Sequence, residues 1–547
     1  MLTKNSLPWI WAGVWVLVWA GVAEAEVRLP PLISDHMVLQ NNAAAPVYGT
    51  AAPGEKITVA FAGNAVAATA DGQGHWIAKF PPLKPSTGAA DMTITDGGGK
   101  ATVVHDVLVG EVWLGSGQSN MFLAVKRVDH AEQEIAAAKY PAIRFFNVKQ
   151  CAASERKTEY AGQWVLCAPE TAVEFSATLY FLGRDLHQAR HIPVGLIHSS
   201  WGATRIETWI SRDSLAGDPE LKTFDAQWKA GAAAYPKLAS DYAAAMAEYP
   251  KQVADAKAKN EKAPRMPQPP LANAELTRPE DSPYMGVPGQ GMVSQPGSLF
   301  NGQIAPLIPY GLAGVVWYQG ESNHGAEQYR RLLPLLIQDW RKAWAQPELP
   351  FIIVQLPNNG IQDNLHARDP DLVGGWAEIR EAQLQTVQAT PHTALAVTID
   401  IGGDLHPRDK QTLGHRLSLA AQSFTDKSVV ATGPEYQAMK IEGHAIRLSF
   451  KSGGLRANPV TNAATTQPEF LKSSGKLFGF SLCGEDRKFV WADAVIEGET
   501  VVVSSKDIVS PVAVRYAWTN NPVCNFANAA GLPASPFRTD DFKPVKK

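Results

Sequence analysis

The sequence has no excess of charge of either sign, no second long apolar run and no metal-ligand cluster. Its 50 Lys and Arg residues nearly balance 53 Asp and Glu, for a formal net charge of −3 over 547 residues. This balance favours neither nucleic acid nor an anionic membrane surface as a partner. After the N-terminal segment, no apolar run is long enough to cross a bilayer. No spacing of Cys and His indicates a zinc site, and we expect neither a metal nor a cofactor.

The N-terminal segment predicts export. Lys4 precedes an apolar run over Trp9–Val22, and the small residues Ala23 and Ala25 stand where signal peptidase cleaves. We therefore interpret residues 1–25 as a signal peptide. The expected protein is periplasmic or secreted, without stable membrane association after cleavage. An uncleaved membrane anchor is the alternative, although the apolar run is short for a membrane span.

Cysteine is scarce, with four residues in the chain. In the oxidising compartment that export predicts, four thiols can pair in three ways. Proximity in the sequence favours the pairs Cys151–Cys167 and Cys483–Cys524. Free buried thiols are the alternative.

Three types of sequence pattern follow one another after the signal peptide. Residues 26–106 contain short alternating strands between turns, which predicts an antiparallel β sandwich. From 107 to 425, strands alternate with helical patterns, as in α/β proteins. A stretch at about 214–296 interrupts this region with exposed helices and a Pro-rich loop, and is interpreted as an insertion, either a lid or a surface elaboration. Residues 426–547 return to short strands and predict a C-terminal β domain.

Polar, Gly-rich corners follow four of the predicted α/β strands. The first strand, 107–114, breaks into the corner 115–120, where two glycines let the backbone turn tightly. A small hydroxyl at the carboxyl end of such a strand lies in the crevice where open α/β sheets bind ligands. Ser119 is therefore the candidate nucleophile, with an ordinary strand and turn as the alternative for this corner taken alone. The predicted elements of the α/β region are strands at 107–114, 192–198, 313–318, 349–356 and 393–400, and helices at 175–187, 327–343 and 410–424.

The other corners supply the remaining groups that acyl transfer needs. His406, on the last corner, is the candidate base, because neutral imidazole accepts protons near neutral pH. A developing oxyanion needs hydrogen-bond donors, which the backbone N–H groups of Ser119 and Gly202 and the side-chain amide of Asn323 can provide.

Four sequence blocks resemble those of the SGNH hydrolase superfamily, and more closely those of sialate O-acetylesterases and related bacterial carbohydrate acetylesterases. The blocks are GEVWLGSGQSNM at 110–121, SSWGAT at 199–204, WYQGESN at 317–323 and LHP at 405–407. The resemblance covers nearly the whole mature chain, from LPPLISDHMVL at 29–39 to GLPASPFR at 531–538. It implies a flavodoxin-like three-layer α/β core, no metal, and removal of acetyl groups from sugars or polysaccharides through a serine nucleophile and a covalent acetyl-enzyme.

One position departs from the superfamily pattern. The acid of these enzymes usually stands three residues before the histidine, where this chain has Gly403. Asp404, two residues before His406, is one replacement. Glu321 is the other, since a glutamate in this block serves in some related acetylesterases. We predict that Asp404 is the acid, ahead of Glu321.

The expected substrate is an acetylated sugar or polysaccharide, with Gln118, Trp201 and Gln319 as its predicted contacts. A non-catalytic carbohydrate-binding protein with a vestigial core is the alternative from another functional class. Against it, the nucleophile, both oxyanion corners and the base are all present. An esterase for a different acyl group is a further alternative.

Overall fold

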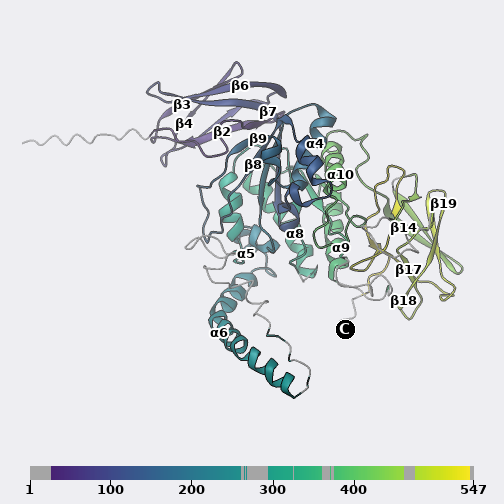
Figure 1. Ribbon diagram of the computed structural model, residues 1–547. Coiled ribbons are helices and arrows are strands. Elements are labelled where there is room, and N and C mark those ends of the chain that lie inside the picture. The colour runs from purple at the N-terminus through teal and green to yellow at the C-terminus, as the bar shows by residue number, and fades with distance from the viewer. Residues whose placement is uncertain are drawn as a thin grey trace, which may run out of the picture.

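The computed structural model describes residues 26–259, 261, 264, 266–267, 293–323, 326–359, 370, 375–451, 453–460 and 475–542. N-terminal β strands, a central α/β body and C-terminal β strands follow one another across the molecule (Figure 1). The α/β body holds a large, mostly parallel sheet, as the alternating pattern of strands and helices predicts. The predicted signal peptide lies outside the described residues, as does most of the Pro-rich part of the predicted insertion.

Apart from β1, which pairs in parallel with a later strand, the N-terminal strands form two antiparallel groups. β2 pairs with β5, while β3 pairs with β4 and β6. Every second residue is buried along β3 and β5, the pattern of strands with one face on a core. The strands are β1 (Val38–Gln40), β2 (Ala45–Thr50), β3 (Lys56–Phe61), β4 (Asn64–Thr69), β5 (His75–Phe80) and β6 (Ser86–Thr95).

One strand, β7 (Ala101–Gly117), belongs to both the N-terminal part and the α/β body. Its first half pairs with β6, and its second half pairs with β10 (Val194–Ser200) and β11 (Gly314–Tyr318). Asp106, with a left-handed φ of 55°, lies where the register with β6 shifts. The predicted boundary between residues 106 and 107 thus falls inside a continuous strand. The corner at the end of β7 is held between β10 and β11.

The central sheet has the order β13–β12–β11–β7–β10–β8–β9. Every neighbouring pair is parallel except β8 with β9, which is antiparallel. Because β7 is the first of these strands and has β10 on one side and β11 on the other, the chain order reverses at its carboxyl end. Ligands of open α/β sheets bind at such switch points. The remaining strands are β8 (Tyr140–Asn147), β9 (Trp164–Cys167), β12 (Phe351–Val354) and β13 (Thr393–Ala396).

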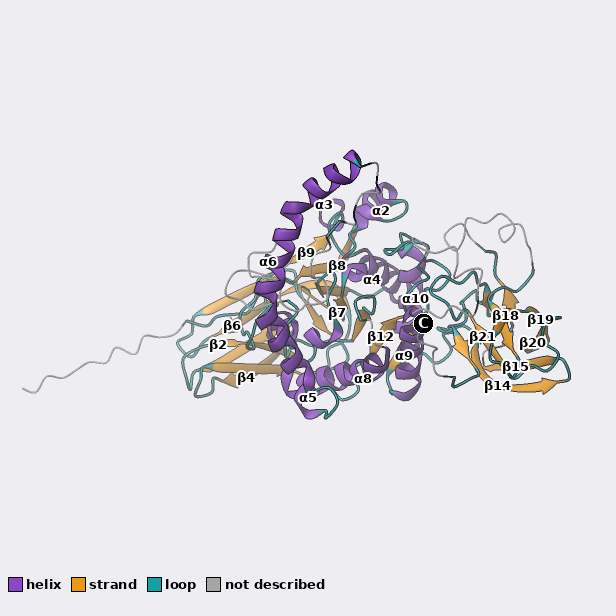
Figure 2. Ribbon diagram, turned by 90° about the horizontal axis from the view of Figure 1, so that it is seen from below, coloured by secondary structure: helices purple, strands orange, loops and turns teal. Residues whose placement is uncertain are grey.

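Helices cover both faces of this sheet. Figure 2 shows these helices and the sheet from below. Val316 and Tyr318 of β11 pack with residues of α4 (Ala177–Arg190) and α10 (Lys410–Ser423). Val315 and Trp317, which alternate with them, pack on the other face with α8 (Ala326–Ala343) and α9 (Gly375–Ala389). Alternate residues of a strand point to opposite faces, so each face of the sheet has its own core.

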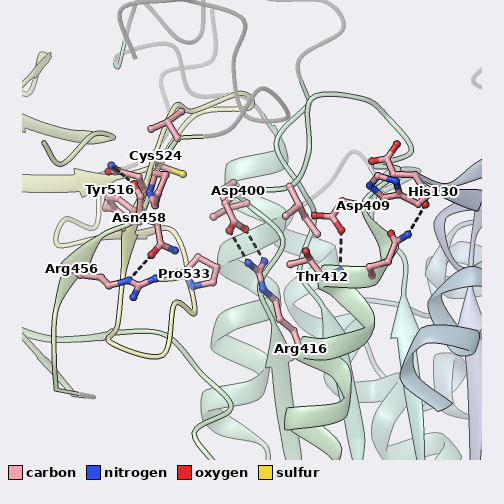
Figure 3. A pocket seen from close by; sticks show the side chains of 17 residues that line it. His130, Asp400, Asp409, Thr412, Arg416, Arg456, Asn458, Tyr516, Cys524 and Pro533 are labelled. Carbon is pink, nitrogen blue, oxygen red and sulfur yellow. Dashed lines mark hydrogen bonds and ion pairs between the residues drawn. The ribbon is translucent and has the colours of Figure 1, made fainter. Parts of the chain in front are cut away.

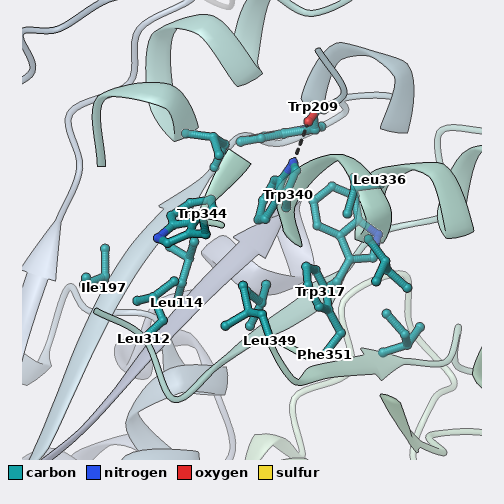
Figure 4. Close-up of a cluster of buried hydrophobic side chains, with 14 of the residues drawn as sticks. Leu114, Ile197, Trp209, Leu312, Trp317, Leu336, Trp340, Trp344, Leu349 and Phe351 are labelled. Atoms are coloured by element: carbon teal, nitrogen blue, oxygen red, sulfur yellow. Dashed lines mark hydrogen bonds between the residues drawn. The ribbon is translucent and has the colours of Figure 1, made fainter. Parts of the chain in front are cut away.

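Tryptophan is frequent in the sequence, and a buried group of these rings joins α8 to the sheet (Figure 4). The ring centroid of Trp317 lies 6.0 Å from that of Trp209 and 5.9 Å from that of Trp340, both edge-to-face. Trp340 Nε1 donates to the Trp209 carbonyl at 2.9 Å. All three side chains are fully buried. Edge-to-face packing with a bonded ring N–H is a stable arrangement for such rings, so these tryptophans serve the core.

The described residues of the C-terminal part form two four-stranded sheets and one two-stranded sheet. Its strands are antiparallel, as the sequence pattern predicts. Arg380 of α9 attaches this part to the α/β body, because its buried guanidinium donates to the carbonyls of Thr519 and Asn520. The strands are β14 (Glu435–Glu442), β15 (Ala445–Lys451), β16 (Arg456–Ala457), β17 (Phe480–Cys483), β18 (Phe489–Trp491), β19 (Asp493–Glu497), β20 (Thr500–Ser504), β21 (Ala513–Tyr516), β22 (Phe526–Ala527) and β23 (Phe537–Arg538).

The region of the predicted insertion begins with α5 (Arg212–Gly217) and continues as α6 (Thr223–Ala258). A single helix of 36 residues takes the place of the several helices predicted there. It projects away from the α/β body (Figure 1). Within the described ranges, no helix combines the length and the apolar character that a membrane span requires.

The predicted disulfides are wrong. Cys167, Cys483 and Cys524 are free buried thiols, so neither Cys151–Cys167 nor Cys483–Cys524 is formed. Burial raises the pKa of the Cys167 and Cys524 thiols to about 12. The alternative prediction, buried unpaired thiols, holds for these three residues.

Candidate active site

Ser119 and His406 meet at the carboxyl edge of the central sheet. Ser119 Oγ lies 2.8 Å from His406 Nε2, although the two residues are 287 positions apart in the chain. Both side chains are half-buried. Ser119 begins the short helix α1 (Ser119–Phe122), directly after the corner of β7. The structure therefore brings together the predicted nucleophile and the predicted base.

The corner of β7 requires glycine at position 117. The φ of Gly117 is 131°, and a Cβ atom there would lie 2.1 Å from the Tyr318 carbonyl oxygen. Gln118 N donates to the same oxygen at 3.0 Å. This close approach of β7 to β11 fixes the turn from which Ser119 projects.

His406 is placed by the loop that joins β13 to α10. The side chain of Asp409 caps α10 by accepting from Thr412 N at 2.9 Å. Burial lowers the pKa of His406, and the charge of Lys410 lowers it further. The charge of Asp404 raises the pKa of His406, and the charge of Arg127 lowers it. The imidazole is therefore neutral at neutral pH, which is the form that a general base requires.

The second predicted corner brings Gly202 next to the nucleophile. β10 runs parallel to β7 with Ser200 opposite Gly117, so the chain reaches Gly202 beside Ser119. A Cβ atom at Gly202 would lie 3.5 Å from Ser119 Cβ. The backbone of this corner thus has access to the reacting group.

Asn323 is held in one orientation by its neighbours. Its Oδ1 accepts from Gln319 Nε2 at 2.7 Å and from Ile206 N at 3.1 Å. Its Nδ2 donates to Glu207 Oε2 at 3.1 Å. Because both partners of Oδ1 are donors, the assignment of oxygen and nitrogen is settled by the hydrogen bonds. The second N–H of this amide has no acceptor among the described residues.

The three predicted substrate contacts have little or no exposed surface. Gln118 is 3% exposed, Trp201 7% and Gln319 0%. Gln319 Nε2 also donates to the Thr204 carbonyl at 3.1 Å, so this side chain supports the position of Asn323. The predicted sugar contacts of Gln118, Trp201 and Gln319 stay predictions, and the burial of Gln319 favours a supporting role at Asn323.

Two exposed apolar side chains that the sequence did not single out flank the serine and the histidine. Phe122, at the end of α1, is 51% exposed, and Leu405, which precedes His406, is 39% exposed. Phe122 is the one aromatic among the large exposed hydrophobic residues of the described ranges. Its position three residues after the candidate nucleophile is the signal that could have identified it.

Neither predicted acid contacts the imidazole ring. Asp404 is exposed, and its Oδ1 accepts from the backbone N of His406 at 3.4 Å. Glu321 Oε1 instead accepts from Asn120 Nδ2 at 2.7 Å. No described residue accepts a hydrogen bond from His406 Nδ1. The residue at the superfamily's usual acid position, Gly403, has a φ of 95°, which residues with a side chain rarely adopt.

A separate cavity of about 620 Å³ lies between the α/β body and the C-terminal part (Figure 3). Neither Ser119 nor His406 lines it. Asp400 and Arg416 form a bidentate ion pair on its wall, with both N–O distances at 2.7 Å. Asp400 is thus held in place by Arg416. Within the described ranges, no cluster of His, Cys, Asp or Glu is arranged to hold a metal ion.

A hydroxyl in contact with an imidazole, beside a glycine corner, is the arrangement that nucleophilic ester hydrolysis requires. Comparison with known proteins points to the same class. A family model described as carbohydrate esterase, sialic acid-specific acetylesterase matches residues 303–422, which include Asn323 and His406.

Whole-chain relatives extend this match. A carbohydrate acetylesterase from Xanthomonas citri of known structure is 30% identical, covers 94% of this chain and 100% of its own, and superposes with a TM-score of 0.73. Sialate O-acetylesterase of Mus musculus is 28% identical over 587 residues, 96% of this chain and 97% of the relative. The Homo sapiens protein of the same name is 28% identical over 574 residues, 95% and 94% of the two chains. The chain belongs to this carbohydrate acetylesterase family, whose members are carboxylic ester hydrolases.

Proposed function

We propose that the chain is a carbohydrate O-acetylesterase that removes acetyl groups from sugars or polysaccharides through Ser119. The observation that carries the proposal is the 2.8 Å contact between Ser119 Oγ and His406 Nε2 at the switch point of the sheet. If β8 and β9 at the edge beside β10 are set aside, the strand order β10–β7–β11–β12–β13, with β7 first in the chain, is that of flavodoxin-like sheets and supports an SGNH-type core. The three-part sequence pattern supports β domains at 26–106 and 426–547 around it.

The chemistry follows from this geometry. Ser119 Oγ attacks the acetyl carbonyl carbon while His406 Nε2 takes the hydroxyl proton. The carbonyl oxygen becomes an oxyanion, which the N–H groups of Ser119 and Gly202 and the Asn323 amide stabilise. As the intermediate collapses, the sugar oxygen leaves with the proton from His406, and Ser119 carries the acetyl group. A water molecule, deprotonated by His406, then releases acetate and restores the serine.

Asp404 is the proposed source of negative charge for the imidazolium that forms in each half of the reaction. Its charge raises the pKa of His406, and it lies on the same loop. In this proposal the carboxylate acts on the imidazole through its electrostatic field, and it also accepts a hydrogen bond from the backbone N–H of His406. Glu321 is the second candidate for the acid.

Phe122 and Leu405 are proposed to form an apolar rim for the sugar ring. Sugar rings have faces made of C–H groups, which pack on exposed aromatic and aliphatic side chains by the same hydrophobic effect that drives burial. The exposure of both side chains beside Ser119 and His406 supports this role.

Acetate release from acetylated xylan, xyloglucan and sialic acid, with 4-nitrophenyl acetate as a simple ester, tests the proposal. We expect wild-type protein to release acetate and Ser119→Ala, folded by circular dichroism, to lose at least about 10⁴-fold in kcat. Retention of more than about a hundredth of wild-type kcat would place the nucleophile elsewhere. Glycan binding without acetate release would support the non-catalytic alternative.

Export to the periplasm or the medium is also proposed, from the pattern of residues 1–25. N-terminal sequencing of the protein recovered from that fraction tests it. A mature N-terminus near Glu26 is expected, whereas an uncleaved Met1 in the membrane fraction would contradict export as a soluble protein.

A further inference from the structure

Lys410 is buried close to the candidate site, since its Nζ contacts Asn120, the residue that follows Ser119. Two physical effects oppose the burial of its ammonium. Its side chain is fully buried, and taking an ammonium out of water is expensive. It is also the first residue of α10, where the positive end of the helix dipole disfavours a cation. Burial lowers the pKa of Lys410 to about 7, against the opposing effects of Glu321 and Asp409. A lysine kept in such a place requires compensating contacts.

Those contacts converge on one amide. Lys410 Nζ donates to Asn120 Oδ1 at 2.9 Å and lies 4.9 Å from the centroid of the Tyr318 ring. Asn120 Nδ2 donates to Glu321 Oε1 at 2.7 Å and to the Leu405 carbonyl at 2.9 Å. Asn120 is fully buried, and its oxygen and both its N–H groups are engaged. The amide therefore has a single orientation, fixed by the Lys410 donor on one side and by the Glu321 and Leu405 acceptors on the other.

This amide joins the two halves of the catalytic pair. Asn120 directly follows Ser119, and Leu405 directly precedes His406. The bond from Asn120 to the Leu405 carbonyl ties the nucleophile corner to the histidine loop, which are otherwise far apart in the chain. We propose that Lys410 is a positioning residue of the acetylesterase: by holding Asn120 between its ammonium and Glu321, it sets the distance between Ser119 and His406.

The same ammonium acts on His406 electrostatically. The charged groups that face His406 are Lys410 from α10, Asp404 from its own loop and Arg127 from the 3₁₀ turn Val125–Arg127. Lys410 is the largest charge effect among them and lowers the pKa of the imidazole. Removal of the ammonium therefore raises this pKa, a change that a purely structural role in packing would not produce.

This inference rests on the proposed function for its kinetic readout, and Lys410→Met tests it. Methionine keeps the apolar stem and most of the length of lysine but lacks the charge and the donor. We expect kcat on 4-nitrophenyl acetate to fall about 10²-fold, with KM changed less than about threefold, because a misplaced pair of reacting groups loses rate and not ground-state binding. The low-pH limb of kcat/KM should move to higher pH. Lys427→Met, which replaces an exposed lysine just beyond α10, is the control and should match wild type.

Histidine-selective NMR titration gives the second readout, with the His406 signal assigned from His406→Gln. We expect a higher pKa of His406 in Lys410→Met than in wild type, whether or not the protein hydrolyses any ester. If the wild-type protein releases no acetate, the proposed function fails. The NMR titration tests the inference about Lys410 independently of that result. A folded Lys410→Met with wild-type kcat and an unmoved His406 titration would overturn the proposal. If Lys410→Met does not fold, Lys410→Gln is measured in its place, and failure of both to fold would also overturn it, since the lysine would then serve stability alone.

Discussion

Replacement of Asp404 by asparagine tests how the candidate acid acts on His406. The carboxylate acts either through its electrostatic field or through a hydrogen bond to the imidazole ring. In a serine triad whose carboxylate bonds Nδ1, the amide variant loses about 10⁴-fold in kcat. Here the carboxylate bonds the backbone N of His406 and is exposed to solvent. Its contribution is therefore the interaction of its charge with the imidazolium of the transition state.

The size of that interaction follows from Coulomb's law. Two unit charges 4 Å apart interact by about 1 kcal/mol in water and by about 4 kcal/mol at the effective dielectric near a protein surface. Because Asp404 is exposed, solvent screening favours the lower end of this range. With about 1.4 kcal/mol for each factor of ten in rate, we expect Asp404→Asn to lower kcat about 5- to 50-fold.

The pH profile gives the sign of the effect. The base works when neutral, so kcat/KM falls as the pH drops through the pKa of His406. In wild type this midpoint should lie below the ordinary histidine value of about 6.5, since burial and Lys410 lower the pKa. Asp404 raises the pKa, so Asp404→Asn should move the midpoint to still lower pH, opposite to Lys410→Met.

Initial rates of 4-nitrophenyl acetate hydrolysis across the pH range, with Glu321→Gln as the matched variant, test this reasoning. Glu321→Gln keeps the acceptor for Asn120 and should cost about tenfold or less. A loss near 10⁴-fold in Glu321→Gln with Asp404→Asn close to wild type would move the acid to Glu321. An unmoved midpoint in Asp404→Asn would refute the electrostatic role, and two negligible losses in rate would leave a Ser–His pair without an acid.

Two further predictions concern groups around the reacting ester. Asn323→Ala should lower kcat by about 10²–10³-fold with little change in KM, because the proposed role of the amide is to stabilise the oxyanion. Steady-state or stopped-flow kinetics would check this, and a change in KM alone would contradict the role. Phe122→Ala should raise KM for an acetylated oligosaccharide about tenfold and leave 4-nitrophenyl acetate hydrolysis nearly unchanged, since only the sugar packs on the apolar rim. Equal effects on both substrates would instead indicate that the substitution displaces the nearby serine.

The sequence predicted the parts of the fold that periodicity controls. The central strands are apolar at nearly every position, and β7, β10, β11 and β12 lie at the predicted places. α9 was missed because its buried face carries polar groups, among them Arg380 and Gln383, which weaken the apolar period. β8 was missed because Pro141 interrupts an otherwise strand-like run. Both elements depend on partners far away in the chain, which no local pattern contains.

Some residues of the candidate site could likewise be predicted from the sequence, and others could not. Ser119, Gly202, Asn323 and His406 stand on glycine corners that a sequence pattern can identify, and the structure brings the serine, the glycine and the histidine together. Lys410 could not be identified from sequence, because a lysine at the start of an amphipathic helix is usually solvated. Its burial depends on the packing of α10 against Tyr318 and Asn120.

The absence of the superfamily's acid and the presence of a buried lysine fit a single electrostatic arrangement. Gly403 has a left-handed φ of 95°, which favours glycine and disfavours a carboxylate residue at this position of the loop. A histidine without a bonded carboxylate and close to Lys410 is a weaker base, but its imidazolium is a correspondingly stronger acid. In deacetylation of a sugar the leaving group is a poorly stabilised alkoxide, which must receive a proton as the bond to carbon breaks. For the proposed mechanism, this arrangement around His406 predicts easier protonation of the leaving sugar oxygen and slower proton removal from Ser119.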